Sequence, residues 1–170
     1  MTTLYLIRHG ETVDNVAQIM QGQRQGKLTA AGMAQIEELG QSLSGIHVDA
    51  ILSSDLRRAY DSAQILSRRF HLPVQTTTLL RERDWGNFTG RHIPSLKGLP
   101  MPENVESLEA LLQRATDFLE WTNEHLKDKT VLAVGHGIIN KAIQAVYHKK
   151  QMREIPRMDN AECRILQIDG

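Results

Sequence analysis

Short apolar runs alternate along the chain with longer stretches in which apolar residues recur every three or four positions. The short runs have no helical period, and several are rich in β-branched residues, so they predict strands. The first of them is expected to be buried. The predicted strands lie at Thr3–Ile7, Val48–Leu52, Val74–Thr78, Thr130–Val134 and Ala161–Ile168.

The longer stretches predict helices between these strands. Thr29 is expected to cap a helix that runs to about Ser44, with its apolar residues on one stripe. The next helix is expected to be capped by Asp55 or Ser54 and to end before Pro73, because proline cannot continue a helix. Both helices therefore have start and stop signals that the sequence alone provides.

Two further helices are predicted at Leu108–Leu119 and Ile138–Tyr147. The alternation of strands and helices predicts a single α/β domain over residues 1–170, with helices on both faces of a central sheet in a three-layer α/β/α sandwich. Residues 11–27 predict a loop with one irregular turn. Trp85–Glu103 contains three prolines and three glycines, which indicates a long loop or flap.

The charge and aromatic content argue against one class of partner. Twenty Lys and Arg side chains balance twenty Asp and Glu side chains, so the formal net charge is zero, and aromatic residues make up 5% of the chain. A nucleic-acid-binding protein needs a basic surface and stacking rings, so we expect no nucleic-acid partner.

The number of cysteines and the length of the apolar runs predict where the protein is located in the cell. The single cysteine, Cys163, cannot form an internal disulfide and is expected to be a buried structural thiol under reducing conditions. No apolar run reaches the roughly 18 residues of a membrane span, and the apolar stretch at the N-terminus is too short for a signal peptide. We therefore expect a cytoplasmic protein without membrane contact.

Candidate chemistry gathers where predicted strands end. His9 follows the first strand in the run RHG, and His136 follows the fourth strand in the run GHG. The second strand is followed by Arg57 and Arg58. Ligands of α/β sheets bind beyond the carboxyl ends of the strands, so these four side chains are expected at one edge.

Arginines and histidines in this arrangement suit a phosphoryl group. A guanidinium group binds phosphate oxygens in pairs, and helix N-termini contribute further N–H donors. A neutral imidazole nitrogen can also attack phosphorus and form a covalent intermediate. The sequence contains no motif for a metal or a nucleotide cofactor, so neither is expected.

Ordered blocks along nearly the whole chain resemble the histidine phosphatase superfamily, also called the phosphoglycerate-mutase-like family. The first block alone would be weak evidence, but the set occurs in family order. The resemblance implies that family's fold, in which the central sheet is mostly parallel. The blocks are Leu6–Thr12 with Asn15, Gln21–Gln23, Leu28-Thr29 with Gly32, Ser54–Ala59, Leu80–Gly86, Glu106-Ser107 and Gly135–Gly137.

The resemblance assigns roles residue by residue. His9 matches the histidine that becomes phosphorylated, and Glu82 matches the proton donor. The remaining catalytic positions, two phosphate-clamping arginines and a second histidine, fall on Arg8, Arg58 and His136. Positions near the substrate fall on Asn15, Gln21, Gly22 and Gly137.

The implied activity is hydrolysis of a small phosphorylated metabolite through a phosphohistidine intermediate. A phosphoglycerate mutase is the alternative, and the short flap argues for hydrolysis because a mutase must keep water from its phosphohistidine. A phosphohistidine-protein phosphatase and a binding module without turnover are further alternatives. The substrate and the oligomeric state are left open.

Some positions depart from the family or have simpler interpretations. Gln25 and Lys27 stand where relatives commonly carry aspartate and proline. Glu82 lies between two arginines and could belong to a surface ion-pair cluster, in which case Asp84 would be the alternative acid. The flap residues Arg91, His92 and Lys97 either touch a second anionic group of the substrate or belong to a solvated loop.

Overall fold

A five-stranded sheet forms the centre of the computed structural model, which describes residues 1–169. The strand order is β3-β2-β4-β1-β5, and every neighbouring pair is parallel except β1 and β5, which are antiparallel. The sheet is therefore mostly parallel, as predicted. The strands span Thr2–Arg8 (β1), Ala50–Ser54 (β2), Val74–Thr77 (β3), Thr130–Gly135 (β4) and Cys163–Ile168 (β5).

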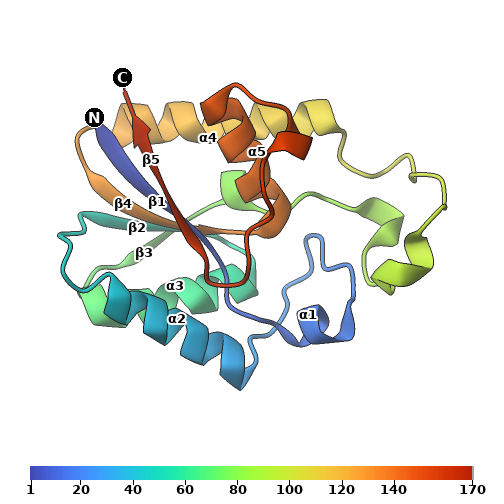
Figure 1. Cartoon of the computed structure of the whole chain (residues 1–170), viewed down its shortest axis with the longest axis horizontal. Coiled ribbons are helices and arrows are strands. Elements are labelled where there is room, and N and C mark those ends of the chain that lie inside the picture. Colours follow the sequence, from blue (N-terminus) through green and yellow to red (C-terminus); the bar gives the residue numbers. More distant parts are fainter. Residues whose placement is uncertain (170) are drawn as a thin grey trace.

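Helices cover both faces of this sheet. Figure 1 shows α2 and α3 on one face and α4 and α5 on the other, while the short α1 lies beyond the sheet. The predicted three-layer α/β/α sandwich is confirmed. None of the helices within residues 1–169 is both long and apolar enough to cross a membrane. The helices span Val13–Ala17 (α1), Ala30–Ser42 (α2), Arg57–Phe70 (α3), Leu108–His125 (α4) and Gly137–His148 (α5).

Two apolar clusters fill the spaces between the layers. Successive side chains of a strand point to opposite faces, so Val131 and Leu132 of the central strand β4 belong to different clusters. Phe118 of α4 is fully buried in the first cluster, and Ile36 of α2 is fully buried in the second. The central strands β1, β2 and β4 are mostly buried on both faces because helices cover both faces of the sheet.

Strand register aligns the polar residues that follow the strands. Arg8 at the end of β1 pairs with Gly135 at the end of β4, and Ser53 of β2 pairs with Val134. The three parallel strands therefore end at the same level of the sheet. This alignment places the segments that follow β1, β2 and β4 along one edge.

The strand bounds differ from the prediction by one or two residues, and β2 and β5 each begin two residues later than expected. β2 begins at Ala50 rather than Val48, because Asp49 uses its side chain to accept a hydrogen bond from the Thr130 amide, and the regular ladder starts one residue later. Val48 is nevertheless buried, which explains the apolar pattern. β5 begins at Cys163 rather than Ala161, because Ala161 has a positive φ of 61° that a strand cannot contain.

The predicted cap of α3 is wrong. Leu56 occupies the N-cap position, and its side chain makes no capping hydrogen bond. Gln25 from the loop after α1 supplies the acceptors instead, since its side-chain oxygen binds the Arg57 amide and its carbonyl binds the Arg58 amide, both at 3.1 Å. The loop and the first turn of α3 are thereby fixed to each other.

The flap at Trp85–Glu103 contains two 3₁₀ turns, Gly86–Phe88 and Ile93–Leu96, and its backbone is attached to the loop after α1. Met20 donates to the Arg91 carbonyl at 2.8 Å and accepts from the Gly90 amide at 2.7 Å. The predicted irregular segment is thus held along one side by backbone hydrogen bonds.

Cys163 is half-buried at the start of β5. Burial raises the pKa of its thiol to about 11, so the thiol is protonated at neutral pH. A protonated, partly buried thiol agrees with the predicted structural role.

The segment after β1 approaches the first turn of α2 so closely that only glycines fit. A Cβ atom on Gly10 would lie 2.4 Å from the Gly32 carbonyl oxygen, and a Cβ atom on Gly32 would lie 2.1 Å from the Glu11 carbonyl oxygen. Both obstacles are backbone atoms, which cannot rotate away. The contact therefore sets the path of the chain immediately after His9.

We expect Gly32→Ala to destabilise the protein. Alanine favours a helix over glycine by about 1 kcal/mol, but the contact with backbone forces a shift that costs more, so we predict a net loss of about 2 kcal/mol in unfolding free energy. Gly45→Ala is the matched control because nothing lies within 4 Å of a Cβ atom there. Urea unfolding measures both, and equal effects of the two substitutions would contradict the steric explanation.

Candidate active site

A cavity of about 250 Å³ opens at the carboxyl edge of the sheet, where the loop after α1, the start of α5 and the flap meet. Every residue to which the resemblance assigns a role lines this cavity, except His136, which is buried against His9; Arg57, also expected at this edge, instead pairs with Asp61. The lining residues in this set are Arg8, His9, Asn15, Gln21, Gly22, Arg58, Glu82 and Gly137.

His9 is buried and carries its proton on a defined nitrogen. Its Nδ1 lies 2.7 Å from the Gly10 carbonyl oxygen, which can only accept, so Nδ1 donates and Nε2 keeps a free electron pair. Burial lowers the pKa of His9 well below its usual value, and the positive charges of Arg58 and Arg8 lower it further. The ring is therefore neutral at neutral pH, with Nε2 unprotonated.

His136 lies against His9 and is also neutral. The two ring centroids are 5.2 Å apart in an edge-to-face arrangement with an angle of 62°. Burial lowers the pKa of His136 well below its usual value, with further contributions from Arg58 and His9. The Ser54 hydroxyl accepts from the Leu56 amide and donates to Nε2 at 2.9 Å, so Nδ1 carries the ring proton. This buried Nδ1 has no hydrogen-bond partner among residues 1–169.

Arg58 reaches the cavity from the first turn of α3 and is 1% exposed. Its Nη1 donates to the Arg24 carbonyl and its Nη2 donates to the Gly22 carbonyl at 2.7 Å. Burial lowers the pKa of Arg58 to about 10, so the group is still cationic at neutral pH. The loop after α1 thus holds this guanidinium group through carbonyl oxygens, which do not neutralise its charge.

Arg8 is the second buried guanidinium group and comes from the end of β1. Its Nη1 donates to the Met158 carbonyl at 2.7 Å, again without a carboxylate partner. Burial lowers the pKa of Arg8, and the nearby charge of Arg157 is the next largest cause. Arg8 and Arg58 therefore place two positive charges beside the neutral imidazoles.

Three buried nitrogen atoms around His9 have no hydrogen-bond partner among residues 1–169. They are Nε of Arg8, Nε of Arg58 and Nδ1 of His136. A buried donor left without a partner costs about 1–3 kcal/mol, so three of them in one place indicate a missing acceptor. An anion with several oxygen atoms is the ligand chemistry that would satisfy them.

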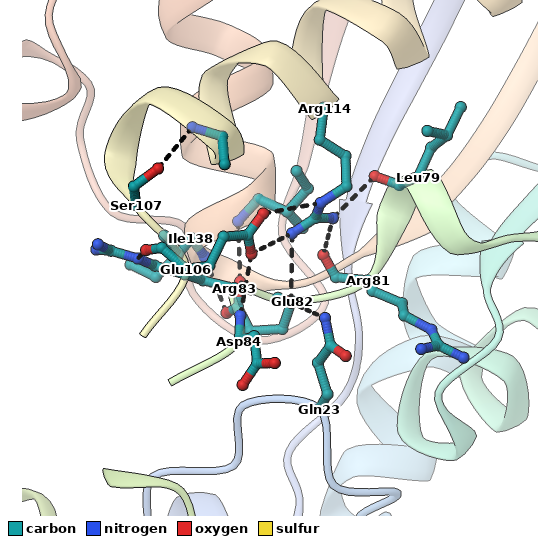
Figure 2. A network of polar contacts seen from close by, with 12 residues as sticks. Gln23, Leu79, Arg81, Glu82, Arg83, Asp84, Glu106, Ser107, Arg114 and Ile138 are labelled. Atoms are coloured by element: carbon teal, nitrogen blue, oxygen red, sulfur yellow. Dashed lines mark hydrogen bonds and ion pairs between the residues drawn. The ribbon is translucent and has the colours of Figure 1, made fainter. Parts of the chain in front are cut away.

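Glu82 lies at the N-terminus of α5 and is 9% exposed (Figure 2). Its Oε1 accepts from the backbone amides of Arg83 and Ile139, at 2.8 and 3.0 Å, and its Oε2 accepts from the Ile138 amide at 3.0 Å. The carboxylate thereby caps a helix whose own N-cap residue, His136, makes no side-chain cap. Oε2 has fewer donors than Oε1 and retains room for a proton.

A network of polar contacts surrounds the backbone of Glu82, as Figure 2 shows. Arg114 of α4 donates from Nη1 to the carbonyls of Leu79 and Arg81, at 3.1 and 2.5 Å, and from Nη2 to the Glu82 carbonyl at 3.5 Å. The carboxylate of Glu106 pairs with Arg114 at 2.8 Å. Residues 79–82 are therefore attached to α4 through one guanidinium group.

The alternative interpretations of Glu82 and its neighbours do not fit this geometry. Arg81 forms a bidentate ion pair with Asp55, at 2.7 and 2.6 Å, rather than with Glu82. Arg83 lies over the Trp85 ring at 4.6 Å. Asp84 is exposed, accepts from the Gly86 amide and does not line the cavity.

The residues proposed for substrate contact lie together, and two of them also make contacts within the protein. Asn15 Oδ1 accepts from the Thr12 amide at 3.0 Å, and Gln21 Oε1 accepts from the Thr12 hydroxyl at 3.0 Å. Gly22 has a positive φ of 51°, a conformation that favours glycine. These contacts fix the side of the cavity that the loop after α1 forms.

The flap contributes different side chains from those considered in the sequence. Arg91, His92 and Lys97 do not line the cavity, whereas Trp85 and Ile93 do. The flap therefore presents an apolar surface to the cavity rather than a charged one.

Two cavity residues, Lys141 and Arg157, were missed by sequence reasoning. Lys141 lies four residues after Gly137 on α5, so helical spacing could have placed both on one face. Arg157 lies in the irregular segment before β5, where no periodic pattern indicates its position. The apolar lining residues that were also missed are Ile19, Met20, Ile93 and Ile138.

Comparisons with known proteins identify the family of this chain. Residues 4–170 match the family described as the histidine phosphatase superfamily (branch 1). An uncharacterised phosphatase, PhoE of Bacillus subtilis, is 36% identical over 140 residues, which cover 81% of this chain and 72% of that protein. A probable phosphoglycerate mutase, GpmB of Proteus mirabilis, is 32% identical over 155 residues, which cover 81% of this chain and 71% of that protein.

A solved structure extends the comparison to the fold. Bacillus stearothermophilus YhfR superimposes with a TM-score of 0.92 at 28% sequence identity, over 100% of this chain and 93% of that one. The match with the family, the similarity to these relatives and the likeness of fold agree with one another. The chain belongs to the histidine phosphatase superfamily, branch 1.

Proposed function

We propose that this protein hydrolyses phosphate monoesters through a phosphohistidine intermediate on His9. One observation carries the proposal: an unprotonated imidazole nitrogen lies beside three buried donors that have no partner among residues 1–169. A phosphoryl group supplies both an electrophile for the nitrogen and oxygen acceptors for the donors. The cavity of about 250 Å³ suits a small phosphorylated metabolite.

In the first step Nε2 of His9 attacks the phosphorus atom in line with the ester oxygen. The bond between phosphorus and the ester oxygen breaks, and Oε2 of Glu82 gives its proton to that oxygen, which leaves as an alcohol. Arg8, Arg58 and His136 hold the other phosphoryl oxygens as charge redistributes among them. The low pKa of His9 supports this role, because a protonated ring could not attack.

In the second step water releases the phosphoryl group. The water gives a proton to Glu82 and attacks phosphorus, and the bond between Nε2 and phosphorus breaks. Inorganic phosphate leaves, and the electron pair returns to Nε2. Glu82 is then protonated again and His9 is neutral, so the site is restored for another cycle.

A mutase is the second candidate, and the similarity to GpmB favours it. Both activities use the same phosphoenzyme and differ in whether water or a second substrate hydroxyl receives the phosphoryl group. Hydrolysis fits better because only Trp85 and Ile93 of the flap line the cavity. A flap with so little contact leaves the phosphohistidine accessible to water.

We expect His9→Ala to abolish hydrolysis of every phosphate monoester, with a fall in kcat/KM of at least about a thousandfold, because no other group supplies the nucleophile. Phosphate release from a panel of phosphorylated metabolites measures the effect. Acid-labile phosphate should appear on the quenched wild-type protein and not on the variant. His148→Ala, which changes an exposed histidine at the far end of α5, is the matched control.

Activity of His9→Ala at the wild-type level would overturn the assignment of the nucleophile. The panel also separates the two candidates when it includes 3-phosphoglycerate with bisphosphoglycerate as a primer. A hydrolase releases phosphate, whereas a mutase interconverts the phosphoglycerates with little release. Predominant interconversion would replace hydrolysis by the mutase activity.

Stability should fall as the pH drops below about 6.5, because the two site histidines stay neutral in the folded state but protonate near 6.5 in the unfolded chain. The unfolded state then binds more protons, so acid favours it. The pair should remove about 3 kcal/mol of unfolding free energy between pH 7.5 and pH 5.5.

Urea unfolding at the two pH values tests this linkage. His9→Asn and His136→Asn each remove one titrating ring, so each should halve the loss between pH 7.5 and pH 5.5, whatever the variant's stability at pH 7.5. A loss of wild-type size in both variants would show that neither ring is responsible.

A further inference from the structure

The cavity carries more positive charge than a phosphoryl group requires. Arg8, Arg58, Lys141 and Arg157 line it, against a single carboxylate, that of Glu82. The dianion of a phosphate monoester matches the two buried arginines. Two further cations are therefore available to the remainder of the substrate, although the chain as a whole has no net charge.

Lys141 and Arg157 have no acidic partner among residues 1–169. Other arginines near the site are neutralised: Arg81 pairs with Asp55, and Arg114 with Glu106. Unpaired cations on a cavity wall raise the local potential and attract anions. Lys141 and Arg157 thus differ from Arg81 and Arg114 in two ways: they line the cavity, and no carboxylate neutralises their charge.

These two cations are less buried than Arg8 and Arg58. Lys141 is one helical turn beyond Gly137 on α5, a rise of about 6 Å along the helix axis. Arg157 is exposed, lies near Arg8 and also lines an adjoining cavity of about 370 Å³, whose lining includes Glu11 and Asp14. There is consequently space for a substrate group beyond the phosphoryl position.

We propose that Lys141 and Arg157 form a second anion-binding subsite, which selects phosphate monoesters that carry another anionic group a few bonds from the ester oxygen. The inference rests on the proposed hydrolysis and adds its substrate class. Trp85, Ile93 and Ile138 line the cavity with apolar groups, so the carbon skeleton between the two anionic groups lies against them.

A pair of substrates that differ only in one carboxylate tests the subsite. The wild type should hydrolyse the phosphate ester of 3-hydroxypropionate at least about tenfold better in kcat/KM than propyl phosphate, the gain expected for one charge-assisted hydrogen bond. The bisphosphate of 1,3-propanediol tests whether a phosphate serves as well as a carboxylate. Added salt should reduce the preference, because the attraction is electrostatic.

Lys141→Met and Arg157→Met should each reduce the preference several-fold, mainly through the KM of the carboxylate ester, and should lower propyl phosphate hydrolysis much less. Lys150→Met is the matched control, because Lys150 is exposed just beyond α5 and lines neither cavity. Equal hydrolysis of both esters by the wild type, or a preference that survives the double variant, overturns the subsite alone. Failure to hydrolyse any ester overturns the proposed function instead.

A second inference comes from Glu106 and Ser107, a motif that the catalytic proposal does not use. The Ser107 hydroxyl caps α4 by accepting from the Ala110 amide at 3.0 Å. The Glu106 carboxylate accepts from the Asp84 amide at 3.0 Å and pairs with Arg114. Ser107 therefore caps α4, and Glu106 connects the start of α4 to the segment that carries Glu82 (Figure 2).

The geometry points to Arg114 and Glu106 as positioning residues for Glu82. Arg114 holds the backbone carbonyl of Glu82 and that of the residue before it, and Glu106 orients the guanidinium group through two contacts, at 2.8 and 3.1 Å. Neither residue lines the cavity, so neither touches the substrate. This inference also rests on the proposed hydrolysis, in which Glu82 protonates the leaving oxygen.

Leaving-group dependence distinguishes positioning from a general structural role. Arg114→Lys keeps the charge but loses the forked geometry, so kcat/KM for propyl phosphate should fall at least about tenfold. The kcat/KM for 2,4-dinitrophenyl phosphate should change little, because it reports the transfer of the phosphoryl group to His9 and this leaving group needs no proton. Glu106→Gln should show the same pattern, to a smaller extent.

Arg164→Lys is the matched control, since Arg164 also combines an ion pair, with Glu162, and hydrogen bonds to backbone carbonyls. It should leave the ratio of the two rates unchanged. Equal losses on both substrates in the Arg114 and Glu106 variants would overturn the positioning role. If wild-type protein hydrolyses neither compound, the proposed function fails instead.

Discussion

Two guanidinium groups held away from water beside two neutral imidazoles are the arrangement on which the rest of the site depends. Burial of a charge is costly, and the usual remedy is a carboxylate partner. Here the partners of Arg8 and Arg58 are backbone carbonyls of Met158, Arg24 and Gly22. Carbonyls satisfy the donors without cancelling the charge, so the positive potential stays available to a ligand.

The sheet makes this arrangement possible because its parallel strands end at one level. β1 supplies Arg8 and His9, β4 supplies His136, and α3 after β2 supplies Arg58. Burial at this edge of the sheet also lowers the pKa of both histidines, so the fold itself keeps the rings neutral. Glu82 joins them from a different direction, since its carboxylate caps α5 from outside that helix.

Sequence reasoning located the centre of the site because strand ends and glycines are local signals. His9 and His136 each follow an apolar run that could be recognised without the fold, and the ordered blocks singled out Arg58 and Glu82. Contacts between distant segments had no such signal: Gln25 caps α3 in place of Asp55 or Ser54, and Arg157 reaches the cavity from an irregular segment. The predicted start of β2 at Val48 was wrong because Val48 is buried but lies outside the hydrogen-bonded strand.

The attachment of the loop after α1 to α3 limits how this protein can diverge. Gln25 caps the helix that carries Arg58, while Gly22 and Arg24 in the same loop hold the Arg58 guanidinium group. Exchanges in this loop would disturb catalysis for every ester at once. Lys141 and Arg157 make no contact with this loop's hold on Arg58. Substitutions at these two positions can therefore change substrate preference while the chemical step is preserved.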